Sequence, residues 1–326
     1  LGLQPIDLWV LDVNGNWDYV SSYVDVQNNM GACTVTAGAS IAGSVAMENG
    51  EAVEAVSVNL AGNVPGIPDF YLTDETGDYH FGSLPMNYDY TLNPIRTGDE
   101  RNGISTLDMI LINRHLVGTT PFNNPYQMIA ADADQSGSIN TFDIITLQKM
   151  ILYLIDEFPH SASWRFVDAD FVFDPSGNPF SSPFPELLSV ANLSSNTIGD
   201  FVAIKVGDVS GNAEPSDLTG SNSGDRSFTG LLPLVVDEAV LEKGEVQTVA
   251  FRAKDFVGVL GYQFTLGFDL ESLELVDYEA GQLPGLDKAN FGLAHLAEGM
   301  ITASWAAQAA LPLEDDAEIF QLTFRA

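Results

Sequence analysis

The sequence predicts a mainly β multidomain fold, α+β overall, in which β-sandwich modules stand in series with one small helical module. Short runs that alternate apolar and polar residues, divided by glycine, proline and asparagine, fill residues 1–95 and 230–326. Between them, residues 96–155 contain two apolar stripes at helical spacing. A chain of 326 residues that is 45% hydrophobic can bury the cores of roughly two to four such domains.

Acidic residues dominate the charge. Asp and Glu number 45 against 12 Lys and Arg, for a formal net charge of −33. Such a surface repels nucleic acid and anionic membranes and attracts divalent cations, although it also suits solubility in a salty exterior. No apolar run reaches the roughly 18 residues of a membrane span. The chain starts at Leu1 without a signal peptide and ends within a predicted strand, so we expect an internal piece of a longer exported protein, extracellular or at the cell surface.

The first two modules are predicted to be β structure. In residues 1–34, two alternating runs flank Asn14-Gly15, a strong hairpin signal, and resemble the last strands of an immunoglobulin-like repeat of the hyalin or polycystic-kidney-disease type. Residues 35–95 contain five expected short strands. Their order, with the run Thr-Asp-Glu-Thr-Gly-Asp-Tyr-His-Phe at 73–81, resembles the prealbumin-type β-sandwich of carboxypeptidase-regulatory-like domains. That resemblance implies that this run is a turn and a strand, not a site.

The most informative segment is the twelve-residue loop Asp132–Asp143. Oxygen-bearing side chains fall at positions 1, 3, 5, 9 and 12, glycine takes position 6, where the chain must turn sharply, and isoleucine takes position 8. Calcium takes six to eight oxygen ligands in flexible geometry, and this spacing wraps them round one Ca²⁺ ion. The alternative is a plain polar turn that caps the helix expected at 142–154. The predicted ligands are Asp132, Asp134, Ser136, Ser138, Asn140 and Asp143.

A related loop–helix unit precedes this one. Residues 97–108 lead into a helix expected at 109–117, and aligning Ile104 with Ile139 matches Ile-Ser-Thr-Leu-Asp with Ile-Asn-Thr-Phe-Asp. A calcium loop with one outgoing helix, repeated once, resembles a dockerin of the kind found in large secreted bacterial proteins. The resemblance implies a second Ca²⁺ site, weaker because threonine and arginine replace usual ligands at positions 1 and 5. Its expected ligands are Thr97, Asp99, the carbonyl of Arg101, and Asp108.

Three segments complete the chain. Residues 156–212 are rich in aromatic residues and proline, and we expect this extension to cover the helices, so that the dockerin-like module runs from 96 to 212. Residues 213–229 have linker composition. Residues 230–326 alternate again, and the run Gly-Tyr-Gln-Phe-Thr-Leu-Gly-Phe-Asp at 261–269 resembles a cohesin. Cohesins are jelly-roll sandwiches that receive dockerins, and this one is expected to be incomplete at its C-terminus.

Three other acidic turns imitate the opening of the calcium loop. They start at Asp12, Asp74 and Asp208, but none has glycine at position 6 or a carboxylate at position 12. We therefore expect plain turns at all three places.

No catalytic constellation is comparably specific. The four histidines are scattered without a zinc-binding pair, and neither a Gly-x-Ser-x-Gly elbow nor a glycine-rich phosphate loop occurs. Carboxylate pairs suited to glycoside cleavage are always available among 45 acidic residues, so their presence indicates nothing. We expect no enzyme.

These patterns predict a calcium-stabilised extracellular scaffold or adhesin. Its expected partners are proteins, either other copies of the chain or other cohesin- and dockerin-bearing proteins, with polysaccharide as a further class and neither nucleic acid nor membrane insertion. Assembly into a filament, through cohesin–dockerin-like contacts or strand donation, is an additional hypothesis. The alternative function is the non-catalytic tail of a secreted polysaccharide hydrolase, either carbohydrate-binding or docking.

Overall fold

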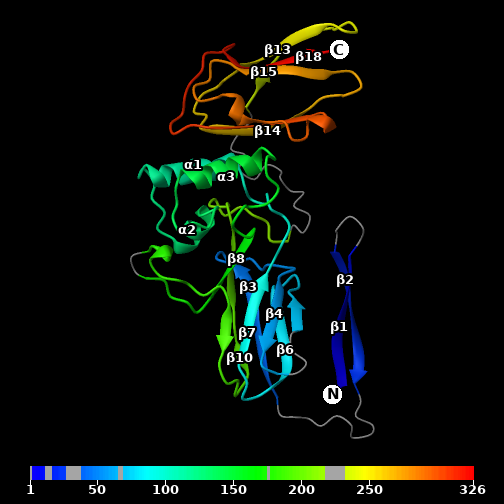
Figure 1. Ribbon diagram of the computed structural model, residues 1–326, viewed down its shortest axis with the longest axis vertical. Coiled ribbons are helices and arrows are strands. Elements are labelled where there is room, and N and C mark those ends of the chain that lie inside the picture. Colours follow the sequence, from blue (N-terminus) through cyan, green and yellow to red (C-terminus); the bar gives the residue numbers. More distant parts are fainter. Residues whose placement is uncertain (1, 12–16, 27–37, 65–68, 175–176, 217–231) are drawn as a thin grey trace.

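The computed structural model describes residues 2–11, 17–26, 38–64, 69–174, 177–216 and 232–326. The described chain is elongated, with one β-sandwich at each end of the long axis and the helices between them (Figure 1). Several sheets and three α-helices make up this part of the chain, which confirms the predicted fold class. None of its helices combines the length and hydrophobicity that a membrane span needs.

The N-terminal hairpin forms as predicted. β1 (Gly2–Leu11) and β2 (Trp17–Val26) pair antiparallel in one continuous register, from Gly2 opposite Val26 to Leu11 opposite Trp17. The predicted Asn-Gly turn lies outside the described residues.

The first sandwich contains the five strands expected in residues 35–95. They are β3 (Gly38–Met47), β4 (Ser57–Gly62), β5 (Asp69–Leu72), β6 (Asp78–Pro85) and β7 (Tyr90–Ile95). Alternate residues of β4, β6 and β7 are buried, as the period of two in a strand requires. Their apolar side chains form one core.

The extension adds strands to both sheets of this sandwich. β8 (Trp164–Asp168), β9 (Leu188–Val190), β10 (Thr197–Ile198) and β11 (Phe201–Lys205) give the strand orders β5-β4-β7-β9 and β10-β3-β11-β8, with β6 also paired to β3. β10 and β11 run parallel to β3. The Tyr79 hydroxyl donates to the Gly199 carbonyl across this junction. The sandwich therefore does not end at residue 95, because its edge strands are paired by a segment some hundred residues further on.

The same extension also packs against the helices, as predicted. α1 (Thr106–Leu116), α2 (Pro125–Ala131) and α3 (Thr141–Ile151) share a core with Phe158, Val167 and Ile204. The 3₁₀ turn η1 (Pro179–Ser181) lies in the same segment. One stretch of chain thus both pairs with strands of the first sandwich and packs against the helices.

The C-terminal sandwich consists of two sheets around its own core. β12 (Leu234–Val235), β13 (Val246–Ala253), β18 (Glu318–Arg325) and β15 (Glu274–Ala280) form one sheet in that order, and β14 (Gly261–Gly267), β17 (Met300–Ala306) and β16 (Phe291–Gly292) form the other. Two 3₁₀ turns, η2 (Lys288–Asn290) and η3 (Leu296–Glu298), connect strands. Trp305 of β17 is fully buried and belongs to this core.

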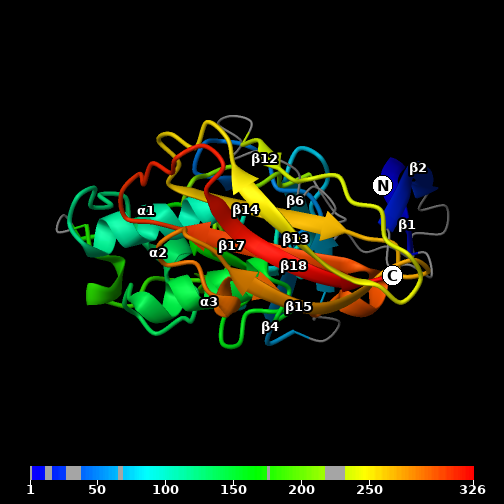
Figure 2. The ribbon, with the colours of Figure 1, turned by 90° about the horizontal axis from the view of Figure 1, so that it is seen from above.

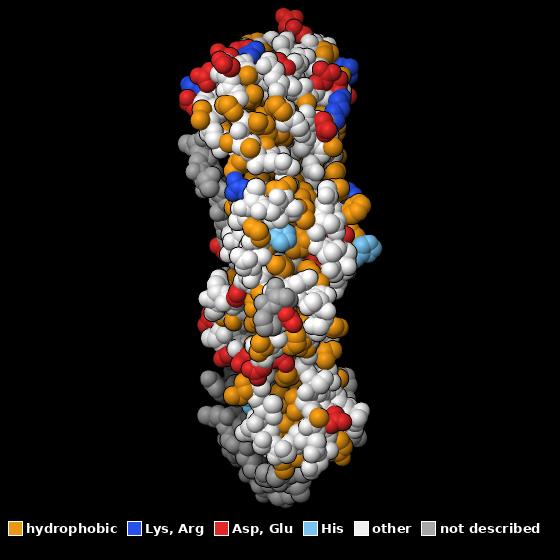
Figure 3. Space-filling model, turned by 90° about the vertical axis from the view of Figure 1, so that its left-hand side faces the viewer, with side chains coloured by type: hydrophobic (Ala, Val, Ile, Leu, Met, Phe, Trp, Pro, Cys, Tyr) orange, Lys and Arg blue, Asp and Glu red, His pale blue; other side chains and the backbone are white. Residues whose placement is uncertain are grey.

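The smaller sheet of this sandwich lies directly on the helices. β14 and β17 contact α1, and β17 also contacts α3, an arrangement visible from the side and from above (Figures 1 and 2). On the face shown in Figure 3, acidic side chains gather at the end formed by the C-terminal sandwich and around the middle of the rod, whereas hydrophobic side chains are spread along its length.

Candidate metal centre

Three carboxylates of the predicted calcium loop converge. Asp132, Asp134 and Asp143 each offer a carboxylate oxygen, and these oxygens all lie within 4.8 Å of one another. Among the described residues, this is the group of three or more potential ligands close enough to hold one metal ion. Asp132 and Asp143 are buried, with 1% and 0% of their surface exposed. Buried carboxylates without a cation nearby are costly, so this arrangement favours a bound positive charge.

Backbone hydrogen bonds fix the orientation of the two buried carboxylates. With Asp132 counted as position 1, its carboxylate accepts N–H bonds from positions 5 and 6, at 2.9 and 3.0 Å. Asp143, at position 12, accepts from positions 3 and 9, at 3.2 and 2.8 Å. Gly137, at position 6, has φ = +77°, which explains why glycine stands there. The loop is thus folded into a ring around its carboxylates.

Asp143 also serves the helix that follows. It forms a capping box with the N-cap residue Asn140, whose side-chain oxygen accepts from Phe142 N at 2.8 Å. The loop therefore does cap the helix, as the alternative interpretation expected. A cap alone does not explain Asp132 and Asp134, which contribute nothing to the helix end.

Burial raises the pKa of both buried carboxyls. Desolvation is the main cause for Asp132, and it raises the pKa of Asp143 to about 6, with the charges of Asp134 and Asp132 adding to the increase. A divalent cation bound between these carboxylates would remove their mutual repulsion.

The remaining predicted ligands lie at the rim of the loop. The Ser136 hydroxyl lies 3.4 Å from Asp132 Oδ1 and 3.2 Å from the Ser138 hydroxyl. Asn140 uses its side-chain oxygen for the helix cap and donates from its nitrogen to the Ser138 carbonyl. The donor set is entirely oxygen, from carboxylates, hydroxyls and carbonyls, which fits calcium and disfavours zinc.

The second predicted site does not form as expected. Asp99 instead makes a buried ion pair with Arg96 at 3.0 Å, and the indole of Trp164 donates to its other oxygen. Thr97 is exposed. The Arg101 carbonyl accepts from Ile104 N in a turn, and the Arg101 guanidinium donates to the carbonyls of Met150 in α3 and Ile155 beyond it. A carboxylate neutralised by arginine has little charge left for a metal.

Asp108, the fourth residue of that prediction, has a different partner. It is fully buried, and its carboxylate accepts from Ser105 N at 2.8 Å and from Ser210 N at 2.9 Å. Burial, followed by the charge of Asp208, raises the pKa of Asp108 to about 7. Residues 208–212, which we expected to form a plain turn, therefore lie against the start of α1.

The hydrogen bonds at this contact follow the same pattern as those of the loop at residues 132–143, which we call the intact loop. With Asp208 counted as position 1, its carboxylate accepts from positions 5 and 6 at 3.1 and 2.8 Å, as Asp132 does. Asp108 accepts from position 3 of this segment and from Ser105, just as Asp143 accepts from positions 3 and 9 of its own loop. Ser105 and Asp108 likewise form the capping box of α1. The first loop is thus split, with its opening at 208–213 and its end at 103–108.

The Asn212 amide faces three oxygens of this split loop. It lies 2.9 Å from the Gly103 carbonyl, 3.2 Å from the Ser210 hydroxyl and 3.3 Å from Asp208 Oδ1. With its nitrogen toward them, the amide donates hydrogen bonds to these atoms. With its oxygen toward them, it adds a further oxygen to a set of the type that calcium prefers.

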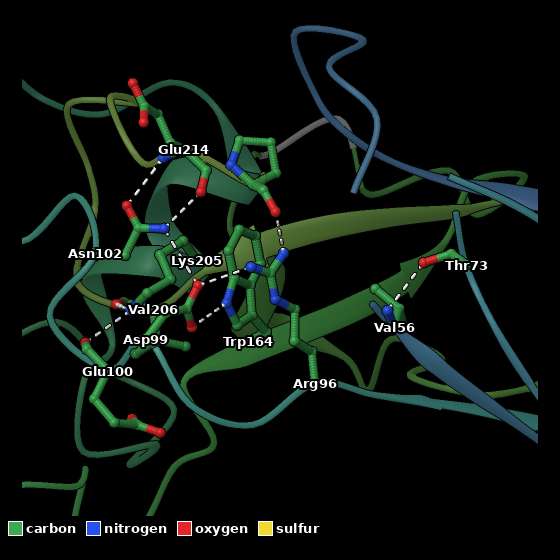
Figure 4. Close-up of polar contacts among 11 residues, drawn as sticks. Val56, Thr73, Arg96, Asp99, Glu100, Asn102, Trp164, Lys205, Val206 and Glu214 are labelled. Carbon is green, nitrogen blue, oxygen red and sulfur yellow. Dashed lines mark hydrogen bonds and ion pairs between the residues drawn. The ribbon is translucent and has the colours of Figure 1, made fainter. Parts of the chain in front are cut away.

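A buried polar cluster holds the two halves of the split loop together. Asn102 exchanges two hydrogen bonds with the backbone of Glu214, at 2.7 and 3.0 Å, and Arg96 donates to the Pro215 carbonyl (Figure 4). The buried Lys205 donates to the carbonyls of Glu100 and Val206. These bonds tie residues 96–102 to residues 205–215.

The sequence contained a signal for the split loop. Asp208-Val-Ser-Gly-Asn212 has oxygen-bearing residues at positions 1, 3 and 5. The expectation of a plain turn lacks the contact with Asp108, because position 12 counted along the chain is Thr219, whereas the carboxylate of Asp108 comes from a hundred residues earlier.

Comparison with known proteins adds little to these observations. No protein-family model matches the chain, and no curated protein matches it. Among solved structures, a chain from a novel type I cohesin–dockerin complex of Clostridium thermocellum is similar, with 12% identity over 30% of this chain and 72% of that chain and a TM-score of 0.26. A likeness at this TM-score does not support a metal or a partner, so those assignments depend on the residues described above.

Proposed function

We propose that this chain is a calcium-stabilised structural segment of an extracellular scaffold or adhesin, without enzymatic activity. The convergence of Asp132, Asp134 and Asp143 within 4.8 Å is the observation that supports it. The dockerin-like reading of residues 96–155 and the cohesin-like reading of residues 230–326 belong to this proposal.

Calcium would contribute mainly to folding. The helical module has three short helices, and two of them begin at the proposed metal loops. Small modules bury too little apolar surface to be stable alone, and a metal bound only by the folded state adds its binding free energy to folding. Bound Ca²⁺ also removes the repulsion between the loop carboxylates.

The first test is a calorimetric Ca²⁺ titration of the chain and of the Asp134→Asn variant. Asp134 is half-buried and makes no cap, so the substitution removes a ligand charge with little effect on the helix. We expect at least a tenfold loss of affinity at this loop, since one ligand charge is worth more than about 1.4 kcal/mol in a cluster of this kind. Asp170→Asn, at an exposed aspartate outside both loops, is the matched control. Equal affinities for the chain and the Asp134 variant would contradict the site.

The second test addresses the split loop. We propose that Asp208, Ser210, Asn212, the Gly103 carbonyl and Asp108 hold a second Ca²⁺, in place of the ligand set expected from the sequence. Asp208→Asn then lowers the calcium stoichiometry from two ions to one, because this residue occupies the first ligand position. Asp74→Asn alters a turn with a similar sequence, whose aspartate side chain accepts hydrogen bonds from Thr76, and leaves the stoichiometry unchanged. One ion bound by the unmodified chain would refute the second site alone.

A further inference from the structure

Asn-Gly pairs occur at three places in the sequence, at 14–15, 49–50 and 102–103. In such a pair the glycine nitrogen can attack the asparagine side-chain amide, because glycine carries no side chain that hinders the approach. The first pair lies outside the described residues. The other two have opposite environments, since Asn49 and Gly50 are exposed in a turn, whereas Asn102 has 1% of its surface exposed. The chain therefore offers one open pair and one closed pair.

The side chain of Asn102 joins the two segments of the split loop. Its oxygen accepts from Glu214 N at 3.0 Å, and its nitrogen donates to the Glu214 carbonyl at 2.7 Å and to Asp99 Oδ2 at 3.2 Å (Figure 4). Both N–H groups and the oxygen of the amide are thus used. Rotation of this amide toward the Gly103 nitrogen would break the three bonds inside a buried site, which is costly. The closed loop therefore opposes the reaction.

Both residues of the buried pair face the segment that follows Asp208. Asn102 bonds to Glu214, and a Cβ on Gly103 would lie 2.7 Å from the Ala213 Cβ. When the two segments separate, the pair gains the rotational freedom and the contact with water that the reaction needs. The second Ca²⁺ proposed above would keep the segments together, because its ligands come from both of them.

We propose that Asn102 is a site of covalent modification, at which the closed split loop prevents deamidation and the loss of its calcium permits it. The inference rests on the proposed second calcium site and adds a form of regulation to it. In the open loop the Gly103 nitrogen forms a bond to Asn102 Cγ and loses its proton, and ammonia leaves, which gives a cyclic imide. Water then opens the ring at either carbonyl and leaves aspartate or isoaspartate at position 102.

Neither product fits the closed loop. A carboxylate at position 102 would put an oxygen in the place of the amide nitrogen, 3.2 Å from Asp99 Oδ2 and 2.7 Å from the Glu214 carbonyl oxygen. Two hydrogen bonds would become repulsive contacts in a buried site. Isoaspartate also lengthens the backbone by a methylene group beside Gly103, which is already packed against Ala213. Deamidation would therefore make a reversible loss of calcium permanent.

Peptide mapping of the full chain by mass spectrometry tests the site. The chain is incubated with Ca²⁺ or with a chelator, and deamidation is followed at Asn102 and, as an internal control, at the exposed Asn49. We expect removal of calcium to raise the rate at Asn102 by about tenfold or more, and to change the rate at Asn49 by less than about twofold.

Calorimetry on the same sample separates the possible failures. If the chain binds two Ca²⁺ ions but Asn102 reacts at the same rate with and without them, the inference is overturned and the proposed function stands. A chain that binds fewer than two ions refutes the second site, and this inference with it.

The Asn102→Asp variant tests the consequence of the reaction. We expect it to bind one Ca²⁺ ion where the unmodified chain binds two, because its carboxylate opposes closure of the split loop. Asn49→Asp makes the same change at the exposed pair and should still bind two ions. A chain aged in chelator and returned to Ca²⁺ needs no substitution, and its loss of the second ion should match the fraction of Asn102 converted. Two ions in the Asn102 variant, or full recovery of the second ion after ageing, would overturn the permanent effect.

Discussion

At the scale of single residues, Asp143 has two tasks that depend on the same charge. Its carboxylate caps α3 and belongs to the proposed metal cluster. Both tasks need the ionised form, yet burial raises its pKa to about 6. Binding of either a proton or a cation removes the cost of this buried negative charge. The charge state of Asp143 therefore depends on both pH and calcium.

We predict that protons compete with calcium at this loop. Below about pH 6 the apparent Ca²⁺ affinity should fall, by up to about tenfold per pH unit for each proton displaced. Without calcium, the folded chain binds more protons here than the unfolded chain between the ordinary pKa of 3.8 and about 6, so this residue lowers stability as pH rises through that window. Calorimetric titrations at about pH 5 and pH 7.5 check the first effect, and chelator-treated thermal melts check the second. A pH-independent affinity would contradict both.

At the scale of elements, the split loop is formed by two segments that are far apart in the sequence and lie together in the fold. Gly103 begins one segment and Ala213 ends the other, and a Cβ on Gly103 would lie 2.7 Å from the Ala213 Cβ. Gly137 has nearly the same φ in the intact loop, +77° against +74°, but nothing lies within 4 Å of the place its Cβ would take. A side chain at Gly137 would therefore cause backbone strain alone. A side chain at Gly103 would cause backbone strain and also clash with the other segment.

We predict that Gly137→Ala costs about 1–2 kcal/mol of folding stability, from the left-handed conformation alone. Gly103→Ala should cost about 1–3 kcal/mol more, because the backbone of residue 213 must move as well. Chemical denaturation of both variants in excess Ca²⁺ measures the difference. Equal losses would mean that the two segments are not in tight contact.

The starts of α1 and α3 were predictable because their signals are local. Ser105 and Asp108, and Asn140 and Asp143, stand at the spacing of capping boxes, and each helix begins at the residue after its N-cap. α2 was not predicted, since seven residues between Asn124 and Asp132 give too short an apolar period to be recognised. β10, with two residues, has no period at all. Its position comes from parallel pairing with β3, which no local pattern encodes.

At the scale of the whole molecule, one segment connects the first sandwich, the helices and the split loop. Residues 156–212 pair with both sheets of the first sandwich, pack on the helices and supply the opening of the split loop. The sequence indicated sandwiches and helices as separate modules because alternation and helical stripes fall in separate ranges. Their connection depends on contacts such as Asn102 with Glu214, whose partners are 112 residues apart. Such pairings are decided by the packed structure and not by the residues near each partner.

This connectivity sets how the molecule should respond to loss of calcium. We predict that a chelator raises hydrogen exchange first in residues 96–155 and in residues 208–213, where the two proposed loops and their helices lie. The cores of the two sandwiches should keep their protection, because each buries its own apolar residues without loop carboxylates. β11 is the informative strand, since it pairs with β3 and β8 on the sandwich side and leads directly into the split loop at Asp208. Protection that is retained in β11 but lost from residue 208 onward would place the limit of the calcium-dependent unit between them. Equal protection throughout, with and without chelator, would show that the metal does not stabilise this part of the fold.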